Sequence, residues 1–274
     1  FTLLLDELGH KYNCLFVTSA GNLFKGWPSA LVDQFKSEGY PNYFSNECAE
    51  ILSPADAINA ISVGSIAFGQ SARSTANLKN PSPFTRINIQ DNRFIKPDFV
   101  SYDSNFIINS TTIETEDNGV YCAGNSDNTL NKMSGTSFTA PLIYHDAGLL
   151  HNAYPSYTAN TVRALLVHFA DSVAAEQILN PDIRKRLIGF GMPNVERSLA
   201  SLSHSATIVV EDEIGINKTK RVLVPIPASI RGSSRKRLRI KKTVVYNSLV
   251  NSKDYAKYNP VDLSVKIIRS DGRP

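Results

Sequence analysis

The order of apolar and polar residues along the first 170 positions predicts helices that alternate with strands. Apolar residues recur with helical spacing over residues 1–11, and a nearly continuous apolar run follows at 15–19. A second such run covers 58–67, and a third begins at 96–100. Apolar runs without alternation are typical of strands in a parallel sheet that is covered on both faces. The pattern therefore predicts an α/β protein built on a parallel sheet.

Small polar residues precede the longest helical pattern in the chain. Residues 134–137, Ser-Gly-Thr-Ser, stand before apolar residues that recur with helical spacing from 138 to 153. Such residues are typical of helix starts, so Ser137 is predicted to lie in the first turn of a long helix. Another helix is predicted over 159–170.

Two stretches between these elements show no sustained period and are predicted to be loops, namely 23–55 and 70–92. The first is unusually aromatic, with Phe24, Trp27, Phe35, Tyr40, Tyr43 and Phe44. Aromatic residues this dense either pack a long loop against the sheet or line a groove for an extended substrate. Packing is favoured, and the groove stays open as an alternative.

The pattern changes after residues 189–193. Runs of alternating or β-branched residues predict antiparallel strands at 206–211, 221–226, 237–246 and 261–268. The charge changes too, because residues 201–274 carry 15 Lys and Arg against 6 Asp and Glu, whereas residues 1–200 carry 14 against 19. These changes predict a larger domain at 1–200 and a smaller, basic, β-rich domain at 201–274.

Composition narrows the class of protein. With 274 residues, 42% of them apolar, the chain can bury one sizeable core and a smaller second one. No run reaches the roughly 18 apolar residues that a membrane span needs. Cys14, Cys48 and Cys122 lack CxxC spacing, which argues against a disulfide framework, and Cys14 is predicted to be buried. The compartment stays unknown, with a lean toward the cytoplasm.

Five short segments occur in a fixed order along the first part of the chain. They are SAGN at 19–22, INAISVGSI at 58–66, PFTR at 83–86, KPDFVS at 96–101 and SGTSFTAPL at 134–142. In this order they closely resemble the subtilase family of serine proteases (peptidase S8) over roughly residues 1–195. The resemblance implies a subtilisin-like parallel sheet with helices on both faces, of which residues 1–200 are the C-terminal part.

The resemblance implies that Ser137 is the nucleophile of a serine endopeptidase and that Asn22 completes its oxyanion hole. A serine hydroxyl is a poor nucleophile at neutral pH, so it needs a neighbouring base, and the tetrahedral intermediate needs donors for its oxyanion. The backbone N–H of Ser137 at a helix N-terminus is one such donor, and the side-chain amide of Asn22 is expected to be the other.

The catalytic base and its aspartate are not found among the motifs of this chain. The subtilase order is Asp, His, Asn and Ser, so the catalytic histidine should precede Asn22. Only His10 does so, and it lacks the His-Gly-Thr context of the family. His145, His151, His168 and His204 follow the motif and are predicted to be structural or solvated. The Asp and His are therefore expected upstream of this chain, and a non-catalytic pseudoenzyme or peptide-binding scaffold is the alternative.

Substrate contacts and cofactors are implied only in part. By resemblance, Ser19, Ala20 and Gly21 form one wall of the pocket for the residue before the scissile bond, and Gly135 and Thr136 border the nucleophile. The expected partner is a protein or peptide substrate, with no cofactor. Calcium bound by acidic loop residues stays open as an alternative, although Asp103, Asp117 and Asp127 lack the spacing of a calcium loop.

The basic segment 231–242, RGSSRKRLRIKK, admits more than one interpretation. Leu238 and Ile240 alternate with basic residues, as in a half-buried strand with one solvated face. A solvated face is favoured over an acidic partner, and nucleic acid is not expected. By a looser resemblance, residues 201–274 correspond to part of the β-sandwich that follows the protease domain in some bacterial subtilases.

Overall fold

The computed structural model describes residues 1–24, 29–89, 94–108, 112–116, 118–127, 129–200, 205–224, 239–251, 258–261 and 263–268. Its α-helices are α1 (Thr2–Tyr12), α2 (Ser29–Glu38), α3 (Thr136–Ala153), α4 (Ala159–Phe169), α5 (Pro181–Ile188) and α6 (Val195–Leu199). Among the described residues, no helix is both long enough and apolar enough to cross a membrane.

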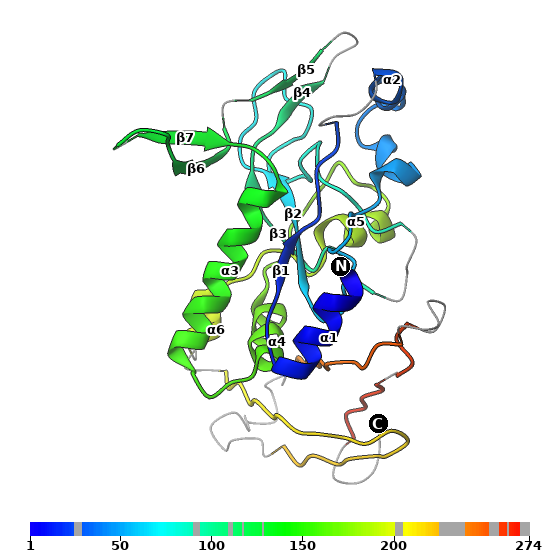
Figure 1. Cartoon of the computed structure of the whole chain (residues 1–274), viewed down its shortest axis with the longest axis vertical. Helices are drawn as coiled ribbons and strands as arrows, with labels where there is room; N and C mark the ends of the chain where they lie inside the picture. Colours follow the sequence, from blue (N-terminus) through cyan, green and yellow to red (C-terminus); the bar gives the residue numbers. More distant parts are fainter. Residues whose placement is uncertain are drawn as a thin grey trace, which may run out of the picture.

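A parallel sheet lies at the centre of the molecule (Figure 1). It is formed by β1 (Val17–Ser19), β2 (Ile61–Ala67) and β3 (Phe99–Asp103), in that order. Val63 of β2 pairs with Ser19 of β1 on one side and with Phe99 of β3 on the other. Every residue of β2 is buried, Ser62 and Ser65 included, as expected for a strand that is covered on both faces. This confirms the predicted parallel sheet.

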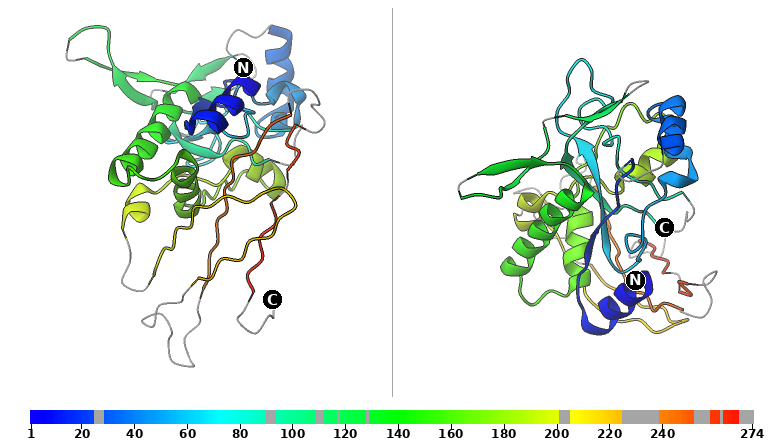
Figure 2. Two further views of the ribbon diagram at one scale, coloured as in Figure 1. Left: turned by 60° about the horizontal axis from the view of Figure 1, so that its bottom comes forward. Right: turned by 45° about the horizontal axis from the view of Figure 1, so that its top comes forward.

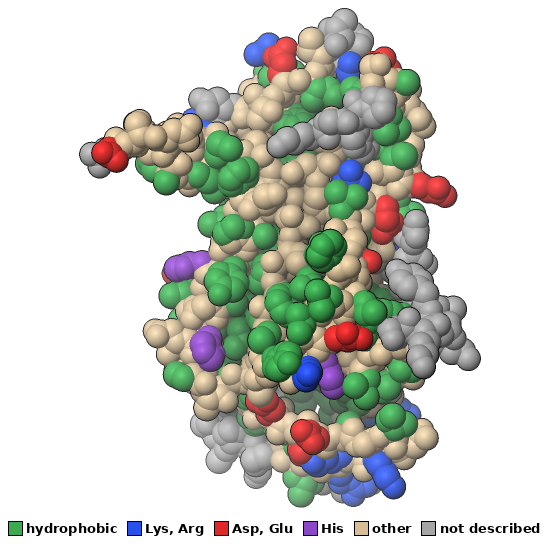
Figure 3. All heavy atoms as spheres, in the orientation of Figure 1, with side chains coloured by type: hydrophobic (Ala, Val, Ile, Leu, Met, Phe, Trp, Pro, Cys, Tyr) green, Lys and Arg blue, Asp and Glu red, His purple; other side chains and the backbone are tan. Residues whose placement is uncertain are grey.

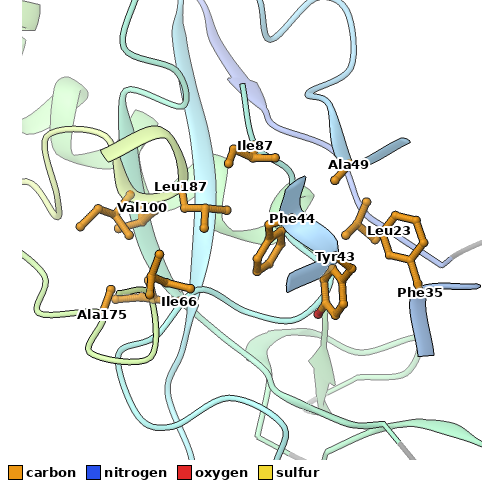
Figure 4. Close-up of a cluster of buried hydrophobic side chains, with 12 residues drawn as sticks. Leu23, Phe35, Tyr43, Phe44, Ala49, Ile66, Ile87, Val100, Ala175 and Leu187 are labelled. Carbon is orange, nitrogen blue, oxygen red and sulfur yellow. The ribbon is translucent and has the colours of Figure 1, made fainter. Parts of the chain in front are cut away.

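Both faces of the sheet are covered, each by its own apolar cluster. Ile61, Val63 and Phe99 pack against residues of α3 and α4 on one face. Ile66 and Val100 belong to the other cluster, which includes Leu187 of α5 (Figure 4). Phe35, Tyr43 and Phe44 of the 23–55 segment belong to the same cluster. The predicted helices at 1–11, 138–153 and 159–170 are confirmed as α1, α3 and α4.

The prediction of an extended loop at 23–55 was wrong. The segment contains α2 and two short 3₁₀ helices, Asn42–Ser45 and Glu47–Ala49. Phe35, Tyr43 and Phe44 are fully buried, and the Tyr43 hydroxyl donates to the carbonyl of Pro83 at 2.7 Å. Their packing against the sheet confirms the favoured interpretation, while Trp27 lies outside the described residues. Tertiary burial holds this segment in a helical form that its own periodicity does not predict.

Two antiparallel hairpins occupy the connection from β3 to α3. One pairs β4 (Phe106–Ile108) with β5 (Ile113–Thr115), and the other pairs β6 (Val120–Ala123) with β7 (Leu130–Met133). The β6–β7 hairpin projects from the body of the molecule and carries exposed apolar side chains (Figures 1 and 3). It ends directly before the residues that open α3.

The C-terminal part of the chain lies along one end of the molecule as extended segments (Figure 2). The described residues of 205–268 contain no strand, so those predicted at 206–211, 221–226, 237–246 and 261–268 do not form within them. Instead these segments bind the first part of the chain: Asn160 of α4 donates to the carbonyl of Val245, at 2.9 Å. Alternating side chains favour extended backbone, but a strand also needs a neighbour to pair with.

The three cysteines are free thiols. Cys14 was predicted to be buried, and this was wrong, because Cys14 is exposed and lies in the connection between α1 and β1. The paired residues of β1 begin at Val17, and the carbonyl of Phe16 accepts from the N–H of Ile61 at 2.8 Å, so Cys14 lies before the sheet.

Candidate active site

Ser137 lies in the first turn of α3, as the sequence predicts, with its side chain exposed. The helix begins after Gly135, whose φ of 138° is a conformation that favours glycine. A side chain at this position would also meet the amide of Asn22 at 3.0 Å. Within the described residues the backbone N–H of Ser137 has no hydrogen-bond acceptor, as expected for the first turn of a helix.

Asn22 is held against the start of α3 by Thr136. The Oδ1 atom of Asn22 accepts from the backbone N–H of Thr136 at 2.9 Å and from its hydroxyl at 3.1 Å. The same hydroxyl accepts from the N–H of Gly21 at 3.1 Å. Because both contacts use Oδ1, the orientation of the Asn22 amide is fixed. Its Nδ2 atom has no acceptor among the described residues. The structure thus brings the predicted oxyanion donor next to the residue that precedes the nucleophile.

The residues before Asn22 form the turn at the carboxyl end of β1. Ser19 is half-buried, and Ala20 is fully buried with its N–H donating to the carbonyl of Val63 at 2.8 Å. Gly21 has a φ of 96°, and a side chain there would lie 2.9 Å from Arg86 and Leu52. Their predicted role in substrate binding stays a prediction, and so does that of Gly135 and Thr136.

The PFTR motif supports this turn, whereas the KPD motif joins the residues before β3 to the start of β2. Arg86 donates from Nε to the carbonyl of Asn22 at 3.2 Å, and from Nη1 to the carbonyls of Cys48 and Glu50. Burial lowers the pKa of Arg86, whereas Cys48 and Glu50 act in the opposite direction. Asp98 accepts from the backbone N–H of Ser62 at 2.8 Å and pairs with Lys96 at 2.6 Å.

Asp103, at the end of β3, contacts the same turn from another strand. Its Oδ2 atom accepts from the N–H of Gly135 at 3.0 Å, and its Oδ1 atom accepts from the N–H of Ser104 at 2.6 Å. Only 1% of Asp103 is exposed. Burial raises the pKa of Asp103 to about 7, although the two N–H donors act to lower it. The sequence shows Asp103 only as one of several scattered acidic residues, so this contact was not predicted.

None of the described histidines hydrogen-bonds to Ser137. His10 is exposed in the last turn of α1, and His145 and His151 are exposed on α3, where histidine side chains lie at the surface (Figure 3). His168 shares a 2.9 Å hydrogen bond with the hydroxyl of Thr243, and its pKa is lowered by burial and by Lys241 and Arg197. His204 lies outside the described residues.

A hollow of about 400 Å³ opens beside Asn22. Asn22, Ser134 and Gly135 form its edge toward the nucleophile. The rest of its lining is largely apolar, with Leu23, Phe24, Val32, Phe84, Phe106 and Ile113, together with Thr115 and Lys36. A cavity of this size and composition can take an apolar side chain of a peptide.

The described residues contain no group of three or more His, Cys, Asp or Glu side chains that could hold a metal ion. Of the three aspartates considered for calcium, Asp103 accepts backbone hydrogen bonds with both oxygens and Asp127 is exposed. Asp117 lies outside the described residues.

The fold and the turn together define the class of protein. A parallel sheet with helices on both faces carries an exposed serine at a helix N-terminus, next to an asparagine at the end of a neighbouring strand. An α/β hydrolase that uses a serine nucleophile and an oxyanion hole requires such an arrangement. Residues 5–191 match the model of the subtilase family, and the chain belongs to that family. The chain carries the subtilisin-like fold.

Comparison with individual proteins gives the extent of the similarity. The chain is 31% identical over 291 residues to the uncharacterized protein y4bN of Sinorhizobium fredii (strain NBRC 101917 / NGR234), which covers 97% of this chain and 66% of that protein. The chain thus spans less than two thirds of the length of the relative it matches.

Among solved structures, similarity extends to the PatG macrocyclase in complex with peptide, with 16% identity, a TM-score of 0.45, and coverage of 72% of this chain and 46% of that one. The prenylagaramide maturation protease PagA gives 15% identity, a TM-score of 0.43, and coverage of 70% of this chain and 52% of that one.

Proposed function

We propose that the whole protein is a serine endopeptidase that cleaves peptide bonds through an acyl-enzyme on Ser137. The observation that carries this proposal is the contact between Asn22 and Thr136, which sets an otherwise unused amide group beside an exposed serine at a helix N-terminus.

The chemistry follows from these groups. A base takes the proton of the Ser137 hydroxyl as its oxygen attacks the carbonyl carbon of the substrate. The N–H of Ser137 and the Nδ2 of Asn22 would donate to the resulting oxyanion. The C–N bond then breaks, the protonated amine leaves, and water hydrolyses the ester on Ser137. No cofactor takes part in this sequence.

We propose that the base and its aspartate come from a segment outside this chain. Three observations support this. No described histidine hydrogen-bonds to Ser137, and the relative y4bN is longer than this chain. β1 also lies at the edge of the described sheet, and an open edge of a parallel sheet is normally covered. For 1–274 by itself we expect negligible peptidase activity, because the serine lacks its base.

The substrate would be a peptide or protein segment that can enter an open site. The apolar hollow beside Asn22 supports a preference for an apolar side chain next to the scissile bond. The basic C-terminal part is proposed to be mainly a solvated face, since Lys241 and Lys242 are exposed even where they donate to the carbonyls of His168 and Val265. An acidic partner for the basic segment 231–242 stays a prediction, and residues 231–238 of this segment lie outside the described residues.

The test is covalent labelling of the whole protein with a fluorophosphonate probe. Wild type should be labelled, Ser137→Ala should not, and Asn22→Ala should react about 10²–10³-fold more slowly because it lacks one oxyanion donor. That magnitude is taken over from subtilisin, a member of the same family. Absence of labelling, or labelling that Ser137→Ala leaves unchanged, would reject the proposal and favour a pseudoenzyme or scaffold.

A further inference from the structure

Each of the three strands of the parallel sheet contacts the N-terminal end of α3. The turn after β1 contributes Asn22, which accepts from Thr136 at 2.9 Å. β2 contributes the carbonyl of Gly64, which accepts from the hydroxyl of Thr139 at 3.2 Å. β3 ends in Asp103, which accepts from the N–H of Gly135 at 3.0 Å. The start of the helix is thus fixed across the full width of the described sheet.

The contact from β3 is a double one. Besides the bond from Asp103 to Gly135, the hydroxyls of Ser104 and Ser134 are hydrogen-bonded to each other. Asp103 in turn accepts from the N–H of Ser104, which fixes the carboxylate relative to its own backbone. Two successive residues of β3 and its connection therefore hold two successive residues of the turn that leads to Ser137.

Burying a carboxylate costs free energy, and the end of a strand does not by itself require one. Asp103 is almost fully buried, and its described partners are backbone N–H groups and not a cationic side chain. A buried anion is favoured, however, where N–H groups at a helix N-terminus point toward it, and Gly135 is the N-cap of the 18-residue α3. The carboxylate thus restrains the start of α3, and the N–H groups that it binds offset part of the cost of its burial.

The turn needs such a restraint. Gly135 adopts a φ of 138°, and glycine in this region has many alternative conformations. Rotation of the Gly135 peptide would carry with it the N–H and the hydroxyl of Ser137, two residues later. A displacement of about 1 Å in a catalytic group can cost on the order of 100-fold in rate.

We propose that Asp103 is a positioning residue for the nucleophile: it holds the Gly135 peptide so that the N–H and hydroxyl of Ser137 face the substrate carbonyl. This inference rests on the proposed function of Ser137. Asn22 contacts the reacting atoms in that proposal, whereas Asp103 acts on them only through Gly135. Ser104 and Ser134 assist by fixing the preceding residue of the turn.

The experiment compares Asp103→Asn with wild type in the whole protein at pH 8, and uses Asp33→Asn on α2 as the matched control. Asparagine keeps the shape of Asp103 but loses the charge and one acceptor atom. The rate constant of fluorophosphonate inactivation should fall about 10–100-fold with little change in the half-saturating probe concentration. Hydrogen–deuterium exchange of residues 130–142 should become faster. Asp33→Asn, whose carboxylate is largely exposed, should change neither quantity.

Ser134→Ala keeps the proposal testable if Asp103→Asn does not fold. It removes only the hydroxyl contact with Ser104 and should cause a smaller loss of the same kind. The proposal is overturned if the folded variants inactivate and exchange at wild-type rates, or if only the half-saturating concentration changes. If wild type itself is not labelled, the proposed function fails, and the exchange measurement then decides by itself whether Asp103 holds the turn.

Discussion

Two buried aspartates lie at opposite ends of the parallel sheet and bind different parts of the chain. Asp6 of α1 accepts from the N–H groups of Ile58 and Asn59, which precede β2, and from the hydroxyl of Tyr258 at 2.7 Å. Asp103 ends β3 and accepts from the N–H groups of Ser104 and Gly135. Both side chains are almost completely shielded from solvent, with 0% and 1% of the residue exposed.

The difference lies in what each carboxylate connects. Asp6 joins the first helix to the start of β2 and to a C-terminal residue 252 positions away, so it stabilises the whole chain. Asp103 joins the end of one strand to the turn that presents Ser137. Burial of a carboxylate is thus compatible with two roles, and the partners decide which one applies. Asp6, at the amino end of the sheet, stabilises the fold. Asp103, at the carboxyl end, holds the turn that carries the proposed nucleophile.

The largest effect is expected from the ionisation of Asp103. Its pKa is raised from 3.8 in the unfolded chain to about 7 in the folded protein, so between these values the folded state holds a proton that the unfolded chain has released. Asp103 contributes about 4 kcal/mol to the free energy of unfolding. This contribution is fully present below pH 3.8 and is lost as the pH rises to 7.

Urea denaturation of wild type and Asp103→Asn at pH 5 and pH 8 measures this contribution. The free energy of unfolding of the variant minus that of wild type should be larger at pH 8 than at pH 5. Wild type loses the contribution of Asp103 between these pH values, whereas asparagine does not titrate. Asp33→Asn, at an exposed position, is the control and should show a constant difference from wild type. A constant difference for Asp103→Asn as well would show that Asp103 is not buried in the way described.

Asp6→Ala should destabilise the fold by about 3 kcal/mol, because it leaves two backbone N–H groups and a tyrosine hydroxyl without their acceptor. The free energy of unfolding in urea measures the loss, with Asp33→Ala as an exposed comparison. Probe labelling per folded molecule should stay at the wild-type value, which separates Asp6 from Asp103. A loss of labelling without a loss of stability would contradict the comparison.

The smallest effect is expected for Tyr258→Phe. This change removes one of the donors to Asp6 and keeps the aromatic ring, so the free energy of unfolding should fall by about 1 kcal/mol. Thermal unfolding can detect the difference. Combining it with Asp6→Ala should cost less than the sum of the two, because both changes remove the same hydrogen bond. Strict additivity would mean that Tyr258 and Asp6 do not interact in solution.

Much of the sheet and of the candidate site could be predicted from local sequence. The largely apolar run at 58–67 identified β2, and the small residues before Ser137 identified the start of α3. Such signals are local, since burial on both faces and a helix start each leave a pattern within a few residues. The aromatic segment 23–55 was different, because its helices are stabilised by contacts with distant residues such as Pro83. The antiparallel strands expected after residue 200 likewise lacked pairing partners among the described residues.

The sequence by itself determined the family, the candidate nucleophile Ser137 and the candidate oxyanion donor Asn22, because each lies in a short motif whose residues are neighbours in the chain. Only the tertiary structure decided that Thr136 orients Asn22 and that Asp103 reaches Gly135, across 114 and 32 positions. The tertiary structure also distinguished Asp103 from the other acidic residues, because it shows Asp103 in contact with the turn before Ser137. A carboxylate has the same chemistry wherever it stands in a sequence, and its role follows from the donors that the fold brings to it.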